Sequence, residues 1–102
     1  MRIMMHVSLP VEPFNAAVRD GSAGAKMKKI MDDLKPEAAY FMADRNGRRC
    51  GVLIVDLPDP SKIPSLAEPW FLTFNAALEF YPVMSPEDLG KAGLESLGKT
   101  WG

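Results

Sequence analysis

The sequence predicts one α+β domain in which strands and helices follow the order β-α-β-β-α-β, with the helices on one face of a four-stranded antiparallel sheet. Three observations lead to this prediction. Short apolar stretches of strand length alternate with two stretches in which apolar residues recur at helical spacing. An Asn46-Gly47 pair between two apolar stretches predicts a hairpin. The length, 102 residues, suits a single domain over residues 1–102.

The N-terminal part predicts a strand followed by helical segments. Residues 2–9 are rich in Ile, Met and Val, and Pro10 ends the predicted strand. A short helical turn is expected over 13–19. Ser22 can cap a second helix, whose apolar stripe falls at i, i+3, i+4 and i+7 and consists of Met27, Ile30, Met31 and Leu34. The Lys35-Pro36 pair ends this helix, because a residue before proline avoids the α region.

Two strands, over 38–45 and 48–57, are predicted to pair through the Asn46-Gly47 turn. This dipeptide suits a two-residue type I′ turn, in which both central residues have positive φ. Such a turn would place Tyr40 opposite Leu53 and Met42 opposite Gly51. It would also place Asp44 opposite Arg49, as a favourable ion pair across the strands.

The C-terminal part predicts a helix, a strand and a tail. A helical stripe covers 63–74, where Pro69 predicts a kink or a division into two short helices. A fourth strand is expected over 77–84. The Ser85-Pro86 pair and the acidic residues that follow it are typical of a helix start. The tail helix contains several glycines and should be weak.

Both faces of the predicted sheet are apolar, and this predicts a partner. Two crossover helices can cover only one face of a four-stranded sheet. The other face would expose an apolar patch too large for a stable monomer. A second sheet from an identical chain is the simplest cover, so we expect a homodimer.

Composition excludes several classes of function. With 12 basic and 13 acidic residues, the net charge of −1 gives no electrostatic reason to expect a nucleic-acid partner. No apolar run is long enough to span a membrane. One cysteine and one histidine allow no disulfide and no cysteine or multi-histidine metal cage, so neither a metal nor a cofactor is expected. The absence of a signal-peptide pattern makes a cytoplasmic protein the expectation.

Two ionisable residues with apolar neighbours are the candidates for proton transfer. His6 lies in the middle of an apolar strand, and its charge can change near neutral pH. Glu79 lies between Leu78 and Phe80, on a strand that should pair with the first one. The alternatives are a half-buried histidine bonded to the backbone and a carboxylate at the rim of the sheet. Cys50 is expected to be buried and inert.

Four further residues are candidates to contact a small apolar or aromatic ligand: Tyr40, Tyr81, Trp70 and Met42. Alternation along the strands allows both tyrosines to share a face with His6. Tyrosine commonly packs its ring and leaves its hydroxyl in water, and Trp70 is most simply a core residue. The seven methionines suggest an adaptable interior, which is a weak sign of a pocket.

Three segments resemble a group of small bacterial proteins of unknown function: KPEAAYF at 35–41, AEPWF at 67–71 and PVMSPEDL at 82–89. The order of elements also resembles the dimeric α+β barrel superfamily, which has a ferredoxin-like fold. That superfamily includes muconolactone isomerases, cofactor-free monooxygenases and stress-responsive barrel proteins. The resemblance implies a homodimer with a ligand cavity between sheet and helices.

Three hypotheses about function follow. The first is a barrel that binds a small molecule without catalysis. The second is a cofactor-independent isomerase or monooxygenase that uses His6 as a proton shuttle, together with Glu79 or a tyrosine. The third is an interaction subunit whose function is the dimer itself. A cavity at His6 would favour the enzyme, whereas a solid core around His6 would favour the interaction subunit.

Overall fold

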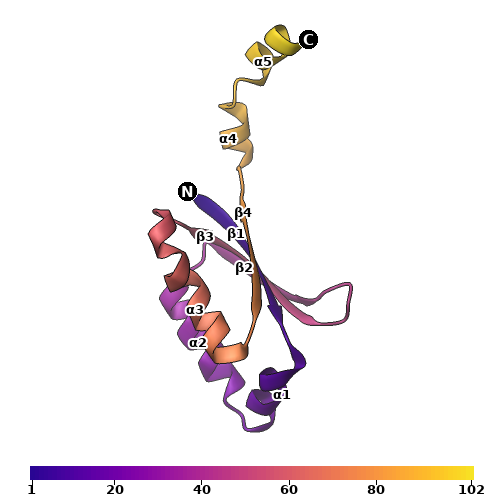
Figure 1. The fold of residues 1–102 in the computed structure, drawn as a ribbon, viewed down its shortest axis with the longest axis vertical. Helices are drawn as coiled ribbons and strands as arrows, with labels where there is room; N and C mark the ends of the chain where they lie inside the picture. Colours follow the sequence, from indigo (N-terminus) through magenta and orange to yellow (C-terminus); the bar gives the residue numbers. More distant parts are fainter.

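A four-stranded antiparallel sheet with the order β2-β3-β1-β4 forms the body of the molecule (Figure 1). The computed structural model describes all residues from Met1 to Gly102. The strands are β1 (Arg2–Leu9), β2 (Ala38–Ala43), β3 (Arg49–Asp56) and β4 (Ala77–Pro82). The helices are α1 (Val11–Arg19), α2 (Ala23–Leu34), α3 (Ile63–Phe74), α4 (Pro86–Gly90) and α5 (Leu94–Trp101), and a 3₁₀ turn, η1 (Pro60–Lys62), precedes α3.

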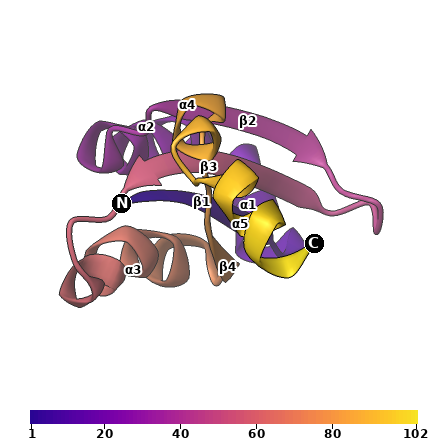
Figure 2. The same ribbon diagram turned by 90° about the horizontal axis from the view of Figure 1, so that it is seen from above.

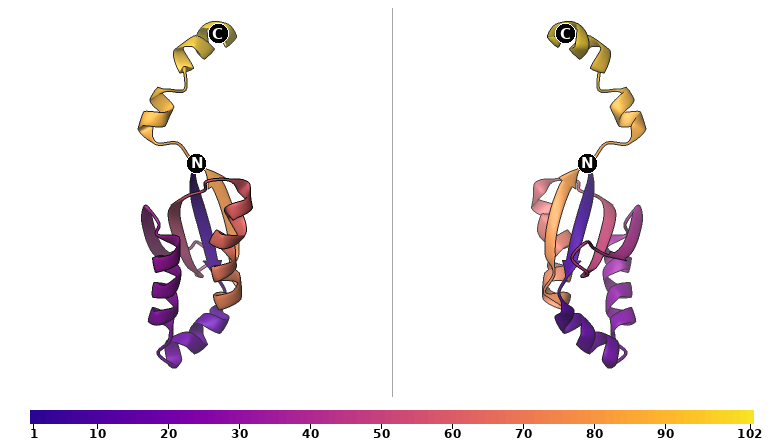
Figure 3. Two further views of the ribbon diagram at one scale, coloured as in Figure 1. Left: turned by 90° about the vertical axis from the view of Figure 1, so that its left-hand side faces the viewer. Right: turned by 90° about the vertical axis from the view of Figure 1, so that its right-hand side faces the viewer.

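The arrangement is a ferredoxin-like α+β fold, as the sequence predicts. The helices α2 and α3 cross between strands and lie side by side over one face of the sheet (Figures 1 and 3). The first strand has the predicted bounds. Helix α2 ends as expected, with Lys35 in the left-handed conformation immediately before Pro36. No helix of the structure is both long enough and apolar enough to cross a bilayer.

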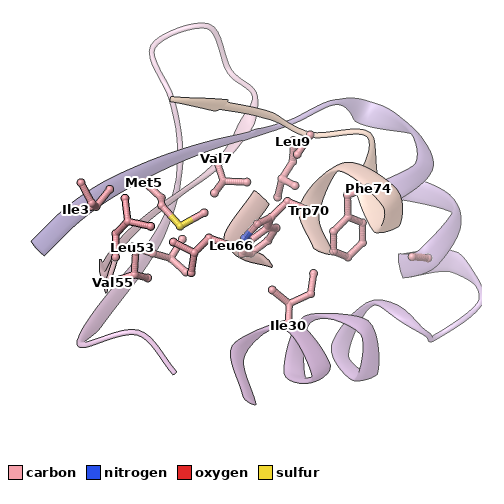
Figure 4. Packing of buried hydrophobic residues seen from close by; sticks show 13 residues of the cluster. Ile3, Met5, Val7, Leu9, Ile30, Leu53, Val55, Leu66, Trp70 and Phe74 are labelled. Carbon is pink, nitrogen blue, oxygen red and sulfur yellow. The ribbon is translucent and has the colours of Figure 1, made fainter. Parts of the chain in front are cut away.

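The core lies between the sheet and its two helices (Figure 4). Alternate residues of β1 point into it, and all four are buried: Ile3, Met5, Val7 and Leu9. From α3, Trp70 and Phe74 are fully buried against them. Phe14 of α1 packs on Phe74, with 4.9 Å between ring centroids. Side chains fill this interior. The resemblance implies a cavity between sheet and helices, and none of the three hollows of the structure is such a cavity.

The prediction of a two-residue type I′ turn is wrong. Asp44 N–H donates to the Arg48 carbonyl at 2.8 Å, so three residues form the loop. Gly47 N–H donates to the Asp44 carbonyl at 2.9 Å, and only Gly47 has positive φ, at 73°. The loop is thus a type I turn followed by a left-handed glycine. Asp44 stabilises it by accepting the backbone N–H groups of Asn46 at 2.8 Å and Arg48 at 3.1 Å.

The extra loop residue shifts the pairing of β2 with β3 by one position. Tyr40 lies opposite Val52 instead of Leu53, and Met42 lies opposite Cys50 instead of Gly51. Because side chains alternate between faces, this shift moves Tyr40 and Met42 to the face away from the helices. The predicted Asp44–Arg49 pair across the strands does not form, since Asp44 bonds to the turn backbone.

Helix α3 is continuous across Pro69, so the alternative of two short helices is wrong. Proline removes one backbone hydrogen bond from the helix. The helix nevertheless buries four side chains against the sheet: Leu66, Ala67, Trp70 and Phe74. This packing offsets the missing bond, because most helical stability in proteins comes from burial of an apolar face.

The C-terminal arm, residues 83–102, continues from β4 beyond the end of the sheet (Figures 1 and 3). Seen from above, α4 and α5 lie in front of the sheet (Figure 2). As predicted, Ser85 caps α4: its hydroxyl accepts the Asp88 N–H, and the Asp88 carboxylate accepts the Ser85 N–H, each at 3.0 Å. Gly93, with φ at 72°, separates α4 from α5. The arm makes the molecule 60 Å long, whereas its other two dimensions are 29 and 19 Å.

Candidate functional site

The face of the sheet away from the helices, called the open face below, carries the candidate site. Strand register places its side chains in rows that cross all four strands. The middle row consists of Tyr40, Val52, His6 and Glu79. The rows on either side consist of Ala38, Ile54, Met4 and Tyr81, and of Met42, Cys50, Ser8 and Ala77. Most of these side chains are apolar, and His6 lies among them. Glu79 lies on the edge strand β4, at the rim of the sheet, as the alternative for this carboxylate expected.

His6 joins two other polar side chains at the centre of the open face. Glu79 lies directly opposite it on β4, and 3.9 Å separates His6 Nδ1 from Glu79 Oε1. On the other side, His6 Nε2 lies 3.0 Å from the Cys50 Sγ of β3. The His6 side chain is 30% exposed and that of Glu79 is 62% exposed. The imidazole is therefore bracketed by a carboxylate and a thiol, and part of it faces solvent.

Cys50 contacts the imidazole as a protonated thiol. Burial, and then the charge of Asp44, raise the pKa of the Cys50 thiol, so the thiol keeps its proton at neutral pH. Its Sγ lies 3.0 Å from His6 Nε2 and 3.8 Å from the Gly51 carbonyl oxygen, so its one proton can go to either acceptor. When the thiol donates to Nε2, the ring proton lies on Nδ1 and faces Glu79.

Tyr81 extends this chain of contacts to the next row. Its hydroxyl donates to Glu79 Oε2. This hydrogen bond, followed by burial and by the charge of Glu79, raises the pKa of Tyr81 above its usual value. Tyr81 therefore stays a hydrogen-bond donor at neutral pH, and one Glu79 oxygen is left for His6 or for a bound molecule. Four side chains, from Tyr81 through Glu79 and His6 to Cys50, form one polar chain across three strands.

The other predicted ligand contacts divide between the two faces. Tyr40 and Met42 lie on the open face but on the edge strand β2, where they are 67% and 47% exposed. Trp70 lies on the opposite side of the sheet, fully buried in the core (Figure 4). The structure therefore brings His6, Glu79 and Tyr81 together, places Tyr40 and Met42 at the edge of the same face, and separates Trp70 from all of them.

Sequence reasoning missed the contact of Cys50 with His6. The two residues do not pair directly: His6 lies opposite Val52, and Cys50 lies opposite Ser8 in the adjacent row. Alternation places Cys50 on the same face as Val52, and this was the signal available in the sequence. The register between β1 and β3, which the sequence does not specify, is needed to bring the thiol to the imidazole.

The hollows of the surface lie away from this polar chain. One, of about 460 Å³, lies at the root of the arm around Arg2, and another, of about 930 Å³, lies between α2 and α3. A third lies beside Gly47. None is lined by His6 or Glu79, so within one chain the candidate site is an open surface. No three His, Cys, Asp or Glu side chains converge as a metal site would require.

Comparison with known proteins identifies a family of unknown function. Residues 1–97 match the family described as "Domain of unknown function (DUF3303)". The chain belongs to this family. No curated protein matches the sequence. Among solved structures, the chain is similar to a formyltetrahydrofolate deformylase from Pseudomonas putida, with 16% identity and a TM-score of 0.48. That match covers 81% of this chain but only 29% of the deformylase, so this DUF3303 chain spans less than a third of that enzyme's length.

Proposed function

We propose that this DUF3303 protein works as a homodimer in which the two open faces meet and hold a small apolar or aromatic molecule beside His6. The apolar side chains of the open face support the dimer. Val52, Ile54 and Met4 are only half-buried in one chain, and Tyr40 and Met42 are exposed. A second sheet over this face would bury roughly 800 Å² per partner, the standard size of a specific interface.

The polar chain that runs from the edge strand β4 into the middle of this apolar face is the observation that carries the proposal. Binding sites for small molecules are mostly apolar, with a few convergent polar groups that fix the orientation of the ligand. Tyr81, Glu79, His6 and Cys50 are such a group. The middle of an apolar interface between two identical sheets is a costly place for an imidazole that has no binding or chemical role.

The geometry of His6 and Glu79 suits a ligand with a hydroxyl group. The 3.9 Å between Nδ1 and Oε1 is too long for a direct hydrogen bond. An oxygen placed about 2.8 Å from both atoms can bond to both at once. It would accept the Nδ1–H of His6 and donate its own proton to Glu79. The ligand class is therefore a small aromatic or apolar molecule with a phenolic or enolic hydroxyl.

A second candidate function, cofactor-independent proton transfer, uses the same contacts. In an isomerase or monooxygenase of this kind, Glu79 would take a proton from the ligand, and the Nδ1–H of His6 would stabilise the resulting oxyanion. The observation that favours it is the bracketing of the imidazole by Glu79 and Cys50, which gives each ring nitrogen a polar neighbour.

Titration with 2-naphthol tests the proposal, because its hydroxyl can reach His6 while its rings cover apolar surface. We expect saturable shifts of the NMR signals of the imidazole of His6, the only histidine. His6→Gln and Glu79→Gln should each weaken binding about tenfold, the equivalent of about 1.4 kcal/mol. Ser8→Ala, on the same face and strand, is the matched control and should leave affinity unchanged. Naphthalene, which has no hydroxyl, should bind the wild type and His6→Gln equally.

Two results would contradict the proposal. The first is that 2-naphthol produces no saturable shift. The second is that it binds His6→Gln as tightly as the wild type, which would remove the imidazole from the site. Proton transfer has its own test, which is hydrogen–deuterium exchange of a ketone such as 2-tetralone at its acidic carbon. Exchange no faster with the wild type than with Glu79→Gln would exclude the second candidate.

A further inference from the structure

The hollow beside the β2–β3 loop collects basic side chains and no acidic one. Its volume is about 280 Å³, and six residues line it: Leu9, Val11, Asn15, Gly47, Arg48 and Arg49. They come from the end of β1, from α1, from the loop and from the start of β3. The loop and α1 lie at the end of the sheet opposite the C-terminal arm (Figure 1). The lining of this hollow therefore carries two positive charges and no negative charge.

The fold fixes one of the two guanidinium groups against α1. Leu9, the last residue of β1, lies opposite Arg49, the first residue of β3. Directly opposite residues point to the same face of a sheet, and Leu9 is buried in the core, so Arg49 points toward the helices. There its Cζ lies 4.6 Å from the centre of the Phe14 ring. This cation–π contact holds the guanidinium against the helix that carries Asn15.

Neither arginine of the hollow has a carboxylate partner. Arg2 and Arg19 form ion pairs with carboxylates elsewhere in the chain, whereas Arg48 and Arg49 form none. A guanidinium group has five N–H donors in a planar fork that matches the oxygens of a carboxylate or a phosphate. The donors of these two side chains are therefore free for a bound anion.

The acidic side chains of the loop and of α1 are occupied by other groups. Asp44 accepts the backbone N–H groups of Asn46 at 2.8 Å and Arg48 at 3.1 Å. Glu12 lies 3.6 Å from the guanidinium of Arg19. Neither carboxylate lines the hollow. An anion that enters it would meet the two guanidinium groups without a carboxylate in the wall.

The lining suits a phosphoryl group attached to a small apolar group. The double charge of a phosphate monoester equals the combined charge of Arg48 and Arg49, and its three terminal oxygens are strong acceptors. The side-chain amide of Asn15 is a further donor. Leu9 and Val11 provide apolar wall for the rest of the molecule. The volume lies at the lower end of the range for ligand pockets, about 300–1,000 Å³, so the molecule must be small.

We propose that this hollow binds a small phosphate monoester, with Arg48, Arg49 and Asn15 as donors to its phosphoryl group and Leu9 and Val11 against its apolar part. All five residues belong to one chain, and the hollow lies away from the polar chain of the open face. The inference therefore goes beyond the proposed function and depends neither on the homodimer nor on a ligand at the open face.

Phenyl phosphate is the probe, because it joins a phosphoryl group to one small ring. Its titration is followed by NMR through the amide signal of Gly47, well above about pH 6, where a phosphate monoester loses its second proton. We expect saturable shifts. Arg48→Gln and Arg49→Gln should each weaken binding about tenfold, and Arg49→Lys, which keeps the charge without the fork, about fivefold.

Arg45→Gln is the matched control. It removes the same charge from the same loop, but Arg45 does not line the hollow, so the affinity should change less than about twofold in physiological salt. Benzoate, which carries one charge, should bind about tenfold more weakly than phenyl phosphate. An excess of 2-naphthol, the probe of the open face, should not displace phenyl phosphate.

Four results would overturn the inference. The first is the absence of saturable shifts, and the second is an equal loss of affinity in Arg45→Gln and Arg48→Gln, which would indicate attraction by the charge of the loop as a whole. The third is benzoate binding as tight as that of phenyl phosphate, which would exclude a site selective for a phosphoryl group. The fourth is displacement by 2-naphthol, which would place the ring on the open face.

Vesicles of phosphatidylcholine with phosphatidate distinguish a lipid headgroup from a small soluble ester. Wild-type protein that sediments with these vesicles and is not released by phenyl phosphate would also overturn the inference. The expected result is that phenyl phosphate binds the free chain and that the protein stays in the supernatant. Arg48 is an exposed loop residue, so Arg48→Gln should keep the Tm of the wild type, and its loss of affinity then reports the site itself.

Discussion

The turn between β2 and β3 decides which residues share a face with His6, and two substitutions test its conformation. Gly47 has φ at 73°, a region in which a residue with a side chain costs about 1–2 kcal/mol. A Cβ added at Gly47 would have no neighbour within 4 Å, so no clash adds to this cost. Asn46 does not have positive φ, and its side chain makes no hydrogen bond. We therefore expect Gly47→Ala to be costly and Asn46→Ala to be nearly neutral, within about 0.5 kcal/mol.

Thermal unfolding measures this difference. For a domain of this size, 1 kcal/mol corresponds to about 4–8 °C in Tm, so Gly47→Ala should lower Tm by about 5–15 °C. Asn46→Ala is the matched control and should shift it by no more than a few degrees. Protein concentration must be equal throughout, because association makes Tm concentration-dependent. Equal losses for the two variants would indicate a type I′ turn, whose register would move Tyr40 and Met42 away from His6.

Three further predictions follow from other parts of the structure. Asn46→Pro should destabilise the fold by about 1 kcal/mol or more, because it removes the 2.8 Å hydrogen bond from its N–H to Asp44 and proline is disfavoured at this position of a type I turn; an unchanged Tm would refute this. Trp70→Ala should lower the free energy of unfolding by about 3–5 kcal/mol in urea, since Trp70 is fully buried, and a loss below about 1 kcal/mol would contradict the core described above. Hydrogen bonds from Ser85 lower the pKa of Asp88 from 3.8, so the ionised carboxylate stabilises α4 fully above pH 3.8, and this stabilisation is lost as the pH falls through the lowered pKa. The NMR signals of α4 should change in that pH range, and an identical change in Asp88→Asn would exclude Asp88 as the cause.

The sequence predicted those elements whose signals are local. The bounds of β1 follow from an apolar run closed by Pro10, and the start of α4 follows from Ser85 and Pro86. The end of α2 follows from Lys35 before Pro36. Each of these depends on the conformational preferences of a few adjacent residues, and these preferences act in the folded chain without help from distant contacts.

The errors concern properties that depend on distant parts of the chain. Asn46-Gly47 is compatible with two turns that differ by one residue, and the carboxylate of Asp44 stabilises the longer one. A one-residue difference in loop length moves every side chain of β2 to the other face of the sheet. The error in the turn therefore changed which β2 residues share a face with His6. Likewise, Pro69 predicts a break in α3 when read locally, whereas burial of Trp70 and Phe74 keeps the helix continuous.

The candidate site could be predicted in part. Alternation within β1 and β4 places His6, Glu79 and Tyr81 on one face, and their proximity in the structure follows from the pairing of β1 with β4. The contact of Cys50 with His6 depends on the register of β1 against β3, which no local pattern specifies. The position of Trp70 in the core depends on which face of the sheet the helices cover, so its separation from His6 appears only in the folded chain.

Sedimentation equilibrium of the full chain at micromolar concentration tests most directly the claim that two open faces meet over His6. The chain has a mass of 11.2 kDa. The account predicts a species of twice that mass, and a shift toward the monomer when an aspartate replaces Val52 in the middle row of the open face. A wild type that sediments with the mass of one chain would contradict the account, because the open face and its polar chain would then stand in water without a partner.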